Sequence, residues 1–220
     1  MKKAASPFRF FTRLALTLIR SEKAHTAEEL LGGLRTLPDG VIYFHTHRFL
    51  HEHQFLVPEP MNDFAYWAEK IAGEPALAKG LSGVNPLRHS TLAQVRSALV
   101  AVVDAHVRKN PGRAPLPAEK AFQFMSARRF SIPTPHTAAN LEEMLEALGR
   151  VTHASLYLHL FEAKLRLPPG ENDFSVWLSA DWGDPSLAEK IRGLDLSLHT
   201  LEEIKNKMVA FLRSSESSHA

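Results

Sequence analysis

Apolar residues recur three and four positions apart through most of the chain. The two clearest stripes are Leu92, Val95, Leu99, Val102 and His106, and Leu201, Ile204, Met208 and Phe211. This spacing puts the side chains on one face of an α-helix and is typical of a helix packed on a core. Thr or Asn followed three residues later by Glu or Gln marks helix starts, here at Thr26, Thr91, Asn140 and Thr200. The pattern predicts a mainly α protein.

Two segments alternate in the way that strands do. "PFRFF" contains Phe8 and Phe10, and "AFQFM" contains Phe122 and Phe124. Alternation over so few residues predicts only a short strand or hairpin at each place.

The same segments begin two series of similar sequences. "TAEELLGGL" resembles "NLEEMLEAL", "IYFHT" resembles "LYLHL", and "NDFAYW" resembles "NDFSVW", in the same order and with an offset that falls from 114 to 110 residues. We interpret the series as a tandem duplication. It predicts two homologous helical units, each including a short strand or hairpin, packed about a pseudo-twofold. The first unit would span 1–110 and carry a histidine cluster, a proline-rich linker would span 111–120, and the second unit would span 121–220.

Composition narrows the classes of function. The chain has 220 residues, 26 Lys plus Arg against 24 Asp plus Glu, and no cysteine. We therefore expect no disulfide, no thiolate metal site and, without a basic stripe, no nucleic-acid partner. No apolar run reaches the roughly 18 residues of a membrane span. A cytoplasmic protein without a membrane partner is the expectation.

The stretch "HTHRFLHEH", residues 45–53, contains four histidines. If 42–56 is one α-helix, His45 faces the core, and we expect it to bond to Asp63 or to the backbone with Trp67 packed alongside. His159 is its counterpart in the second series. His47 and His51 fall together on the other side, where we expect solvent.

The candidate binding residues of this region are His45, His47, Arg48, His51, His53 and Asp63. His47 and His51, four apart, can ligate one divalent metal ion from a helix face. Only Asp63, Glu59 and Glu52 suggest themselves as a third ligand, and "HRFLH" lacks the glutamate of the zinc-protease motif. A general base at Asp63, a ligand surface and an ordinary solvated helix face are the other interpretations.

The segments "HTHRFLHEH", "NDFAYW", "YLHLFEAKLRL", "ENDFSVW" and "LDLSLHTLEEI" together resemble an uncharacterised prokaryotic family, domain of unknown function 5752. The resemblance covers nearly the whole chain and implies a bacterial or archaeal protein, but it implies no activity, substrate or catalytic residue.

Two classes of function follow. The first is a non-enzymatic scaffold or a protein that binds a small molecule or a protein partner, which includes a homo-oligomer. The alternative is a small metal-dependent, hydrolase-like enzyme that uses His47 and His51. A divalent metal is the only cofactor that the sequence suggests, and whether the protein is an enzyme stays open.

Overall fold

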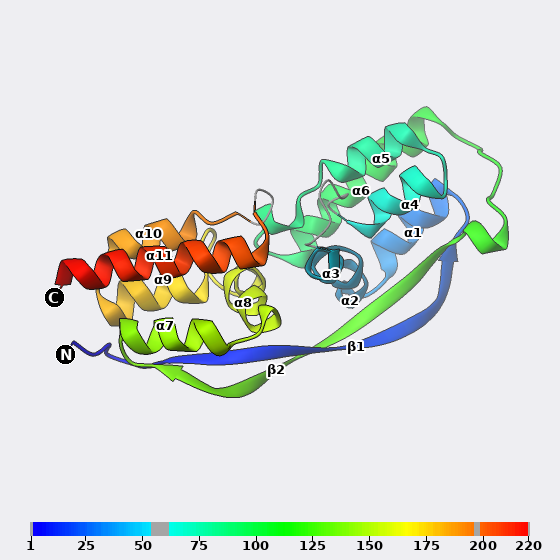
Figure 1. Ribbon diagram of the computed structural model, residues 1–220. Helices are drawn as coiled ribbons and strands as arrows, with labels where there is room; N and C mark the ends of the chain where they lie inside the picture. Colours follow the sequence, from blue (N-terminus) through cyan, green and yellow to red (C-terminus); the bar gives the residue numbers. More distant parts are fainter. Residues whose placement is uncertain (1, 54–61, 196–198, 220) are drawn as a thin grey trace. The chain divides into compact units, whose positions relative to one another are not determined.

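The computed structural model describes residues 2–53, 62–195 and 199–219 (Figure 1). The chain forms two compact units, and neither is simply one half of the sequence. Unit 1 consists of Met1–Leu14 and Phe130–Ala220, and unit 2 is Ala15–Arg129. These units differ from the stretches 1–110 and 121–220 because each takes part of both strands.

The two strands are long. β1 (Phe8–Ala24) and β2 (Phe122–Ala138) each have 17 residues and pair antiparallel in one two-stranded sheet. The start of β1 and the end of β2 belong to unit 1, and the end of β1 and the start of β2 belong to unit 2. Pro133 and Pro135 fit in β2 because each strand of a two-stranded sheet has an open edge, where an amide is not required.

The predicted fold class is therefore wrong. We expected a mainly α protein made of tandemly duplicated helical units, each with a short strand or hairpin. Instead, the helices are combined with one large sheet whose strands run into both units, and no tandem duplication is shown. The strands continue well beyond the alternating phenylalanines, and Leu16 and Leu18 in the middle of β1 are about half exposed.

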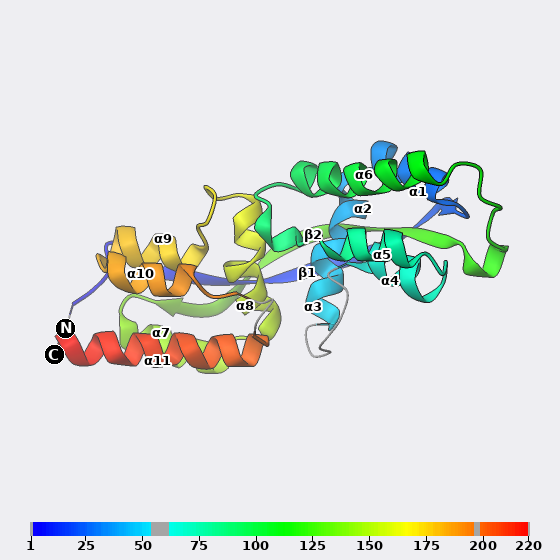
Figure 2. The same cartoon turned by 90° about the horizontal axis from the view of Figure 1, so that it is seen from above.

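Unit 2 contains six α-helices among its described residues: α1 (Ala27–Thr36), α2 (Asp39–Tyr43), α3 (Phe49–His53), α4 (Asp63–Lys70), α5 (Pro75–Ser82) and α6 (Leu92–Lys109). A π-helical turn, Phe44–Arg48, joins α2 to α3, and 3-10 turns lie at Pro86–Arg88 and Ala118–Lys120. Helix α1 packs on α6 and α4 packs on α5 (Figure 2).

The core of unit 2 forms where β2 meets these helices. Phe122 and Phe124 are buried there with Phe64. Gly33 of α1 permits the close packing, because a Cβ on it would clash with the ring of Phe124. The second glycine of "LLGGL" therefore lies where helix α1 packs against strand β2.

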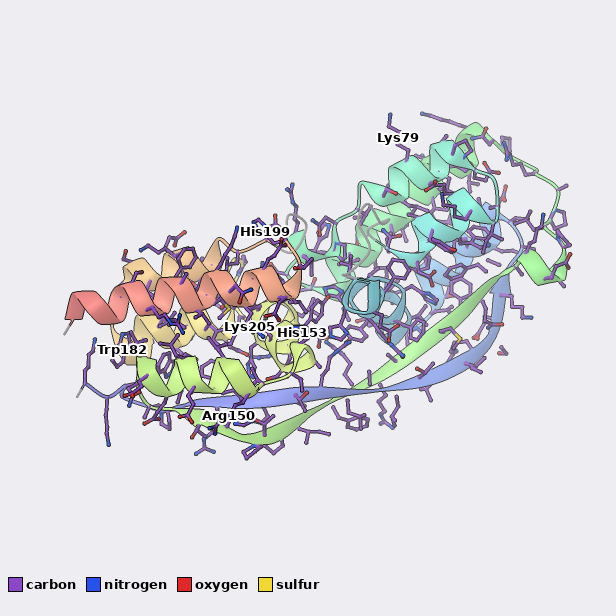
Figure 3. All side chains as sticks on the ribbon, viewed as in Figure 1. Lys79, Arg150, His153, Trp182, His199 and Lys205 are labelled. Carbon is purple, nitrogen blue, oxygen red and sulfur yellow. The ribbon has the colours of Figure 1, made fainter. Side chains whose placement is uncertain are left out.

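Unit 1 contains five α-helices among its described residues: α7 (Leu141–Arg150), α8 (His153–Leu160), α9 (Asp173–Trp177), α10 (Pro185–Arg192) and α11 (Leu201–His219). A 3-10 turn (Glu162–Leu165) follows α8 and a π-helical turn (Leu178–Trp182) follows α9. Helix α11 packs on α7, α8 and α10. His153 of α8 and Lys205 of α11 both bond to Glu202 of α11. Figure 3 labels His153 and Lys205 on these two helices.

The predicted helix starts are confirmed. The hydroxyl of Thr26, for example, accepts the backbone N–H of Glu29 at 3.1 Å, and the Glu29 carboxylate accepts the N–H of His25. Thr91, Asn140 and Thr200 begin their helices in the same way. No helix among the described residues is long and apolar enough to cross a membrane.

Candidate functional site

His45 is held at both ring nitrogens in unit 2. Its Nδ1 lies 2.6 Å from the Asp63 carboxylate, and the backbone N–H of Met125 donates to its Nε2 at 2.9 Å. Nε2 is therefore unprotonated, and Nδ1–H donates to Asp63. The prediction of a buried His45 bonded to Asp63 is confirmed. Trp67 packs on Phe122, whose ring contacts His45 in turn.

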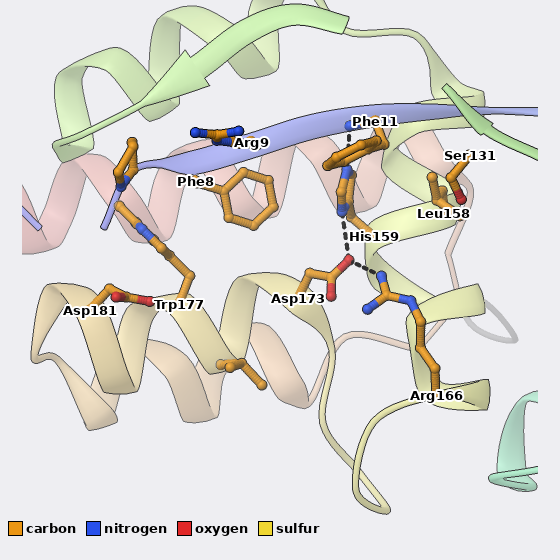
Figure 4. A pocket seen from close by; sticks show the side chains of 12 residues that line it. Phe8, Arg9, Phe11, Ser131, Leu158, His159, Arg166, Asp173, Trp177 and Asp181 are labelled. Atoms are coloured by element: carbon orange, nitrogen blue, oxygen red, sulfur yellow. Dashed lines mark hydrogen bonds and ion pairs between the residues drawn. The ribbon is translucent and has the colours of Figure 1, made fainter. Parts of the chain in front are cut away.

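His159 is held in the same way in unit 1. Its Nδ1 lies 2.6 Å from Asp173, and the backbone N–H of Phe11 donates to its Nε2 at 2.8 Å. Arg166 adds a third link, because its guanidinium donates to the same oxygen of Asp173 (Figure 4). In each unit, the histidine of a helical segment thus links a strand amide to a carboxylate at the start of a later helix.

The electrostatics keep His45 neutral and Asp173 ionised. Burial lowers the pKa of His45 below its usual value, although the hydrogen bond and charge of Asp63 act in the opposite direction. For Asp173, burial raises the pKa, but the hydrogen bonds from His159 and Arg166 outweigh it and the pKa falls. In both histidines each ring nitrogen is already bonded, Nδ1 to a carboxylate and Nε2 to a strand amide. The two pairs are suited to holding the fold.

His47 is buried and does not face solvent. It is 1% exposed, and its ring stacks on Tyr43 at 6.0 Å with an interplanar angle of 10°. Its Nδ1 lies 3.2 Å from the Thr46 hydroxyl. The expected placement was wrong because Phe44–Arg48 is a π-helical turn. Its i→i+5 bonds widen the helix, so the rotation of 100° per residue assumed for an α-helix does not apply there.

The remaining candidates do not gather around His45. Arg48 bonds to Glu52 and Thr17 and lies over the ring of Phe44. His51 is partly exposed on α3. The side chain of His53 and the whole of Glu59 lie outside the described residues. Within the predicted set, the structure shows a bond between His45 and Asp63.

The metal-binding prediction gains no support from the described side chains. Within residues 2–53, 62–195 and 199–219, no three or more His, Asp or Glu side chains come together in a way that could hold a metal ion.

A cavity of about 420 Å³ lies beside the His159–Asp173 pair in unit 1 (Figure 4). Phe8, Phe11 and Trp177 form an aromatic wall, to which Leu158 and Val176 add apolar surface. Four charged residues also line it: Arg9, Arg166, Asp173 and Asp181. We call these four the charged rim.

The charged rim is only half paired. Arg166 and Asp173 bond to each other. The side chains of Arg9 and Asp181 make no hydrogen bond or ion pair with any residue that the structure describes. The backbone of Asp181 is fixed, since its carbonyl accepts the N–H of Ala5 at 2.9 Å.

Sequence reasoning did not find the charged rim as a site. Arg9 had a weak signal, as the polar position between two core phenylalanines. Arg166 and Asp181 had none, because only the tertiary fold brings them to the start of β1.

The fold and the site define a protein of helices and one long two-stranded sheet, with an aromatic and charged cavity in one unit. The chain belongs to the DUF5752 family, a family of unknown function whose model matches residues 5–213. It is also similar to OrfY from Thermoproteus tenax, a solved structure with 28% sequence identity and a TM-score of 0.81, over 98% of both chains. No curated protein matched the chain.

Proposed function

We propose that this protein is a non-enzymatic binding protein that holds a small organic molecule in the cavity of unit 1. One observation carries the proposal: the cavity combines an aromatic wall with two charged side chains, Arg9 and Asp181, that no described residue neutralises. Pockets for small molecules are mostly apolar, contain a few polar groups that fix orientation, and enclose roughly 300–1,000 Å³. At about 420 Å³, this cavity lies within that range.

The hydrogen bonds of His159 support a binding function over a catalytic one. A general base needs a free lone pair within reach of the proton that it abstracts. The lone pair of His159 Nε2 accepts the Phe11 amide, and its Nδ1–H donates to Asp173. The carboxylate of Asp173 is in turn held by Arg166. These groups are therefore already hydrogen-bonded within the protein in the absence of a ligand.

Among the residues that the structure describes, nothing favours the metal-dependent alternative. His47 stacks on Tyr43 in the core, and Arg48 is engaged by Glu52 and Thr17. The absence of nucleic-acid partners, a cytoplasmic location and a homo-oligomeric or protein partner stay predictions. The near-balance of 26 basic and 24 acidic residues supports the first of them.

A thermal-shift screen of small metabolites tests the proposal, because a ligand that binds only the folded state raises the melting temperature. Val176 is a half-buried lining residue. We expect Val176→Phe to fill the cavity and abolish the shift, while the control Val176→Ala keeps it. Mass spectrometry should recover the ligand unchanged. Turnover would favour an enzyme, and a shift that Val176→Phe leaves intact would place the ligand elsewhere.

A further inference from the structure

We infer that the ligand is a zwitterion, namely an α-amino acid with an apolar or aromatic side chain. This inference rests on the proposed function and names the chemical class of ligand for the same cavity. The charged rim carries two positive and two negative residues, so its charges sum to zero. A ligand with an excess of either sign would meet as much repulsion as attraction there.

The two open groups of the rim have opposite signs. Arg9 is exposed at the start of β1, and its guanidinium presents a planar set of donors that fits a carboxylate. Asp181 is half-buried in the π-helical turn after α9, and its carboxylate only accepts, which fits an ammonium group. These are the two charged groups of an amino acid.

Arg9 and Asp181 line the same cavity without forming an ion pair with each other. The pairing that would neutralise both is therefore left to the ligand. A molecule that carries a carboxylate and an ammonium group offers a partner of the right sign to each residue. A simple anion satisfies only Arg9 and faces the carboxylates of Asp173 and Asp181, and a simple cation has the opposite problem.

The aromatic wall next to the charged rim fits the side chain of the amino acid. Phe8, Phe11 and Trp177 line the cavity with aromatic surface. Trp177 is fixed in place, because its indole N–H donates to the carbonyl of Ser6 at 2.8 Å. An apolar or aromatic side chain would lie against this wall, since aromatic surface contributes strongly to binding.

Three probes of similar shape test the contribution of each ligand charge to binding. They are phenylalanine, phenylalanine amide, which lacks the carboxylate, and 3-phenylpropionate, which lacks the ammonium group. Calorimetry on the intact protein should show phenylalanine binding at least tenfold more tightly than either analogue. Val176→Phe should abolish binding of phenylalanine.

Two variants test which residue binds which charged group of the ligand. Arg9→Ala should weaken phenylalanine at least tenfold without weakening the amide, and Asp181→Asn should weaken phenylalanine without weakening 3-phenylpropionate. The matched controls Arg88→Ala and Glu142→Gln, at exposed positions outside the cavity, should alter neither. Circular dichroism checks that each variant folds.

The outcomes separate this inference from the proposed function. If either analogue binds as tightly as phenylalanine, or if only other compounds of the screen bind in a way that Val176→Phe blocks, the zwitterion is wrong and the binding function stands. If no compound binds the cavity, both are wrong.

Discussion

The His45–Asp63 and His159–Asp173 pairs share one hydrogen-bond pattern and differ in their surroundings. Each histidine accepts a strand amide and donates to a carboxylate at 2.6 Å. The Asp63 side chain is 29% exposed, whereas that of Asp173 is 15% exposed and is also bound by Arg166. The cavity with the charged rim lies beside the second pair. The hydrogen bonds make each pair a structural link, and the two pairs differ in the groups around them.

The link has a clear physical role. An amide at the open edge of a two-stranded sheet still needs an acceptor when helices cover it. His45 and His159 supply that acceptor for Met125 and Phe11, and their aromatic surface remains in the core. The carboxylate then fixes the ring orientation. A histidine near a carboxylate is therefore weak evidence for catalysis when a main-chain N–H occupies its second nitrogen.

Removal of either histidine should have the largest effect. We expect His45→Ala and His159→Ala each to lower the free energy of unfolding by about 3 kcal/mol, since each leaves a cavity and an unsatisfied amide. Urea denaturation measures both. Losses that differ by more than about 2 kcal/mol would show that the two pairs do not have equivalent structural roles.

His47→Ala should come next, with a loss of about 2 kcal/mol, because the ring is buried against Tyr43. The same denaturation experiment applies. A loss below about 0.5 kcal/mol, as for an ordinary surface change, would restore the solvated face that the α-helical pattern suggested.

The pH dependence of stability tests whether His45 is neutral in the folded protein. Its folded pKa lies below the usual 6.5, so the unfolded chain binds more protons between the two values. Stability is therefore complete above about pH 6.5 and falls as the pH drops towards the folded pKa. His45→Gln should flatten part of this fall in melting temperature. An unchanged slope would mean that His45 is not held neutral in the folded protein.

Loss of Arg166 should have the smallest effect on stability. Its side chain is 52% exposed, and exposed ion pairs contribute about 0–1 kcal/mol. Arg166→Ala should lower the free energy of unfolding by at most about 1 kcal/mol. It should also raise the pKa of Asp173, which NMR titration of the carboxyl carbon can follow. An unmoved pKa would mean that His159 alone keeps this carboxylate ionised.

Local features were predictable from the sequence, and those that depend on distant residues were not. The caps at Thr26, Thr91, Asn140 and Thr200 lie within four residues of their partners and were predicted correctly. The bond between His45 and Asp63 was also anticipated. The length of the strands was not, because the exposed Leu16 and Leu18 owe their conformation to strand pairing and not to burial.

The errors at the site have similar causes. The position of His47 depends on a π-helical turn, which a period of 3.6 residues does not reveal. Arg9 and Asp181 are 172 positions apart in the sequence, and only the completed unit 1 places them on one cavity.

The split composition of unit 1 bears on the order in which the protein folds during synthesis. Unit 2 is one continuous stretch that is complete once Arg129 has left the ribosome. The first residues of β1 must wait longer, because Phe11 bonds to His159, 148 residues later. Closing so long a loop costs entropy and slows folding. Until then Phe8 and Phe10 lack their helical partners, and exposed aromatic residues of this kind favour aggregation. We therefore expect the nascent chain to be most vulnerable to aggregation at its first strand, in the interval between the synthesis of Arg129 and that of His159.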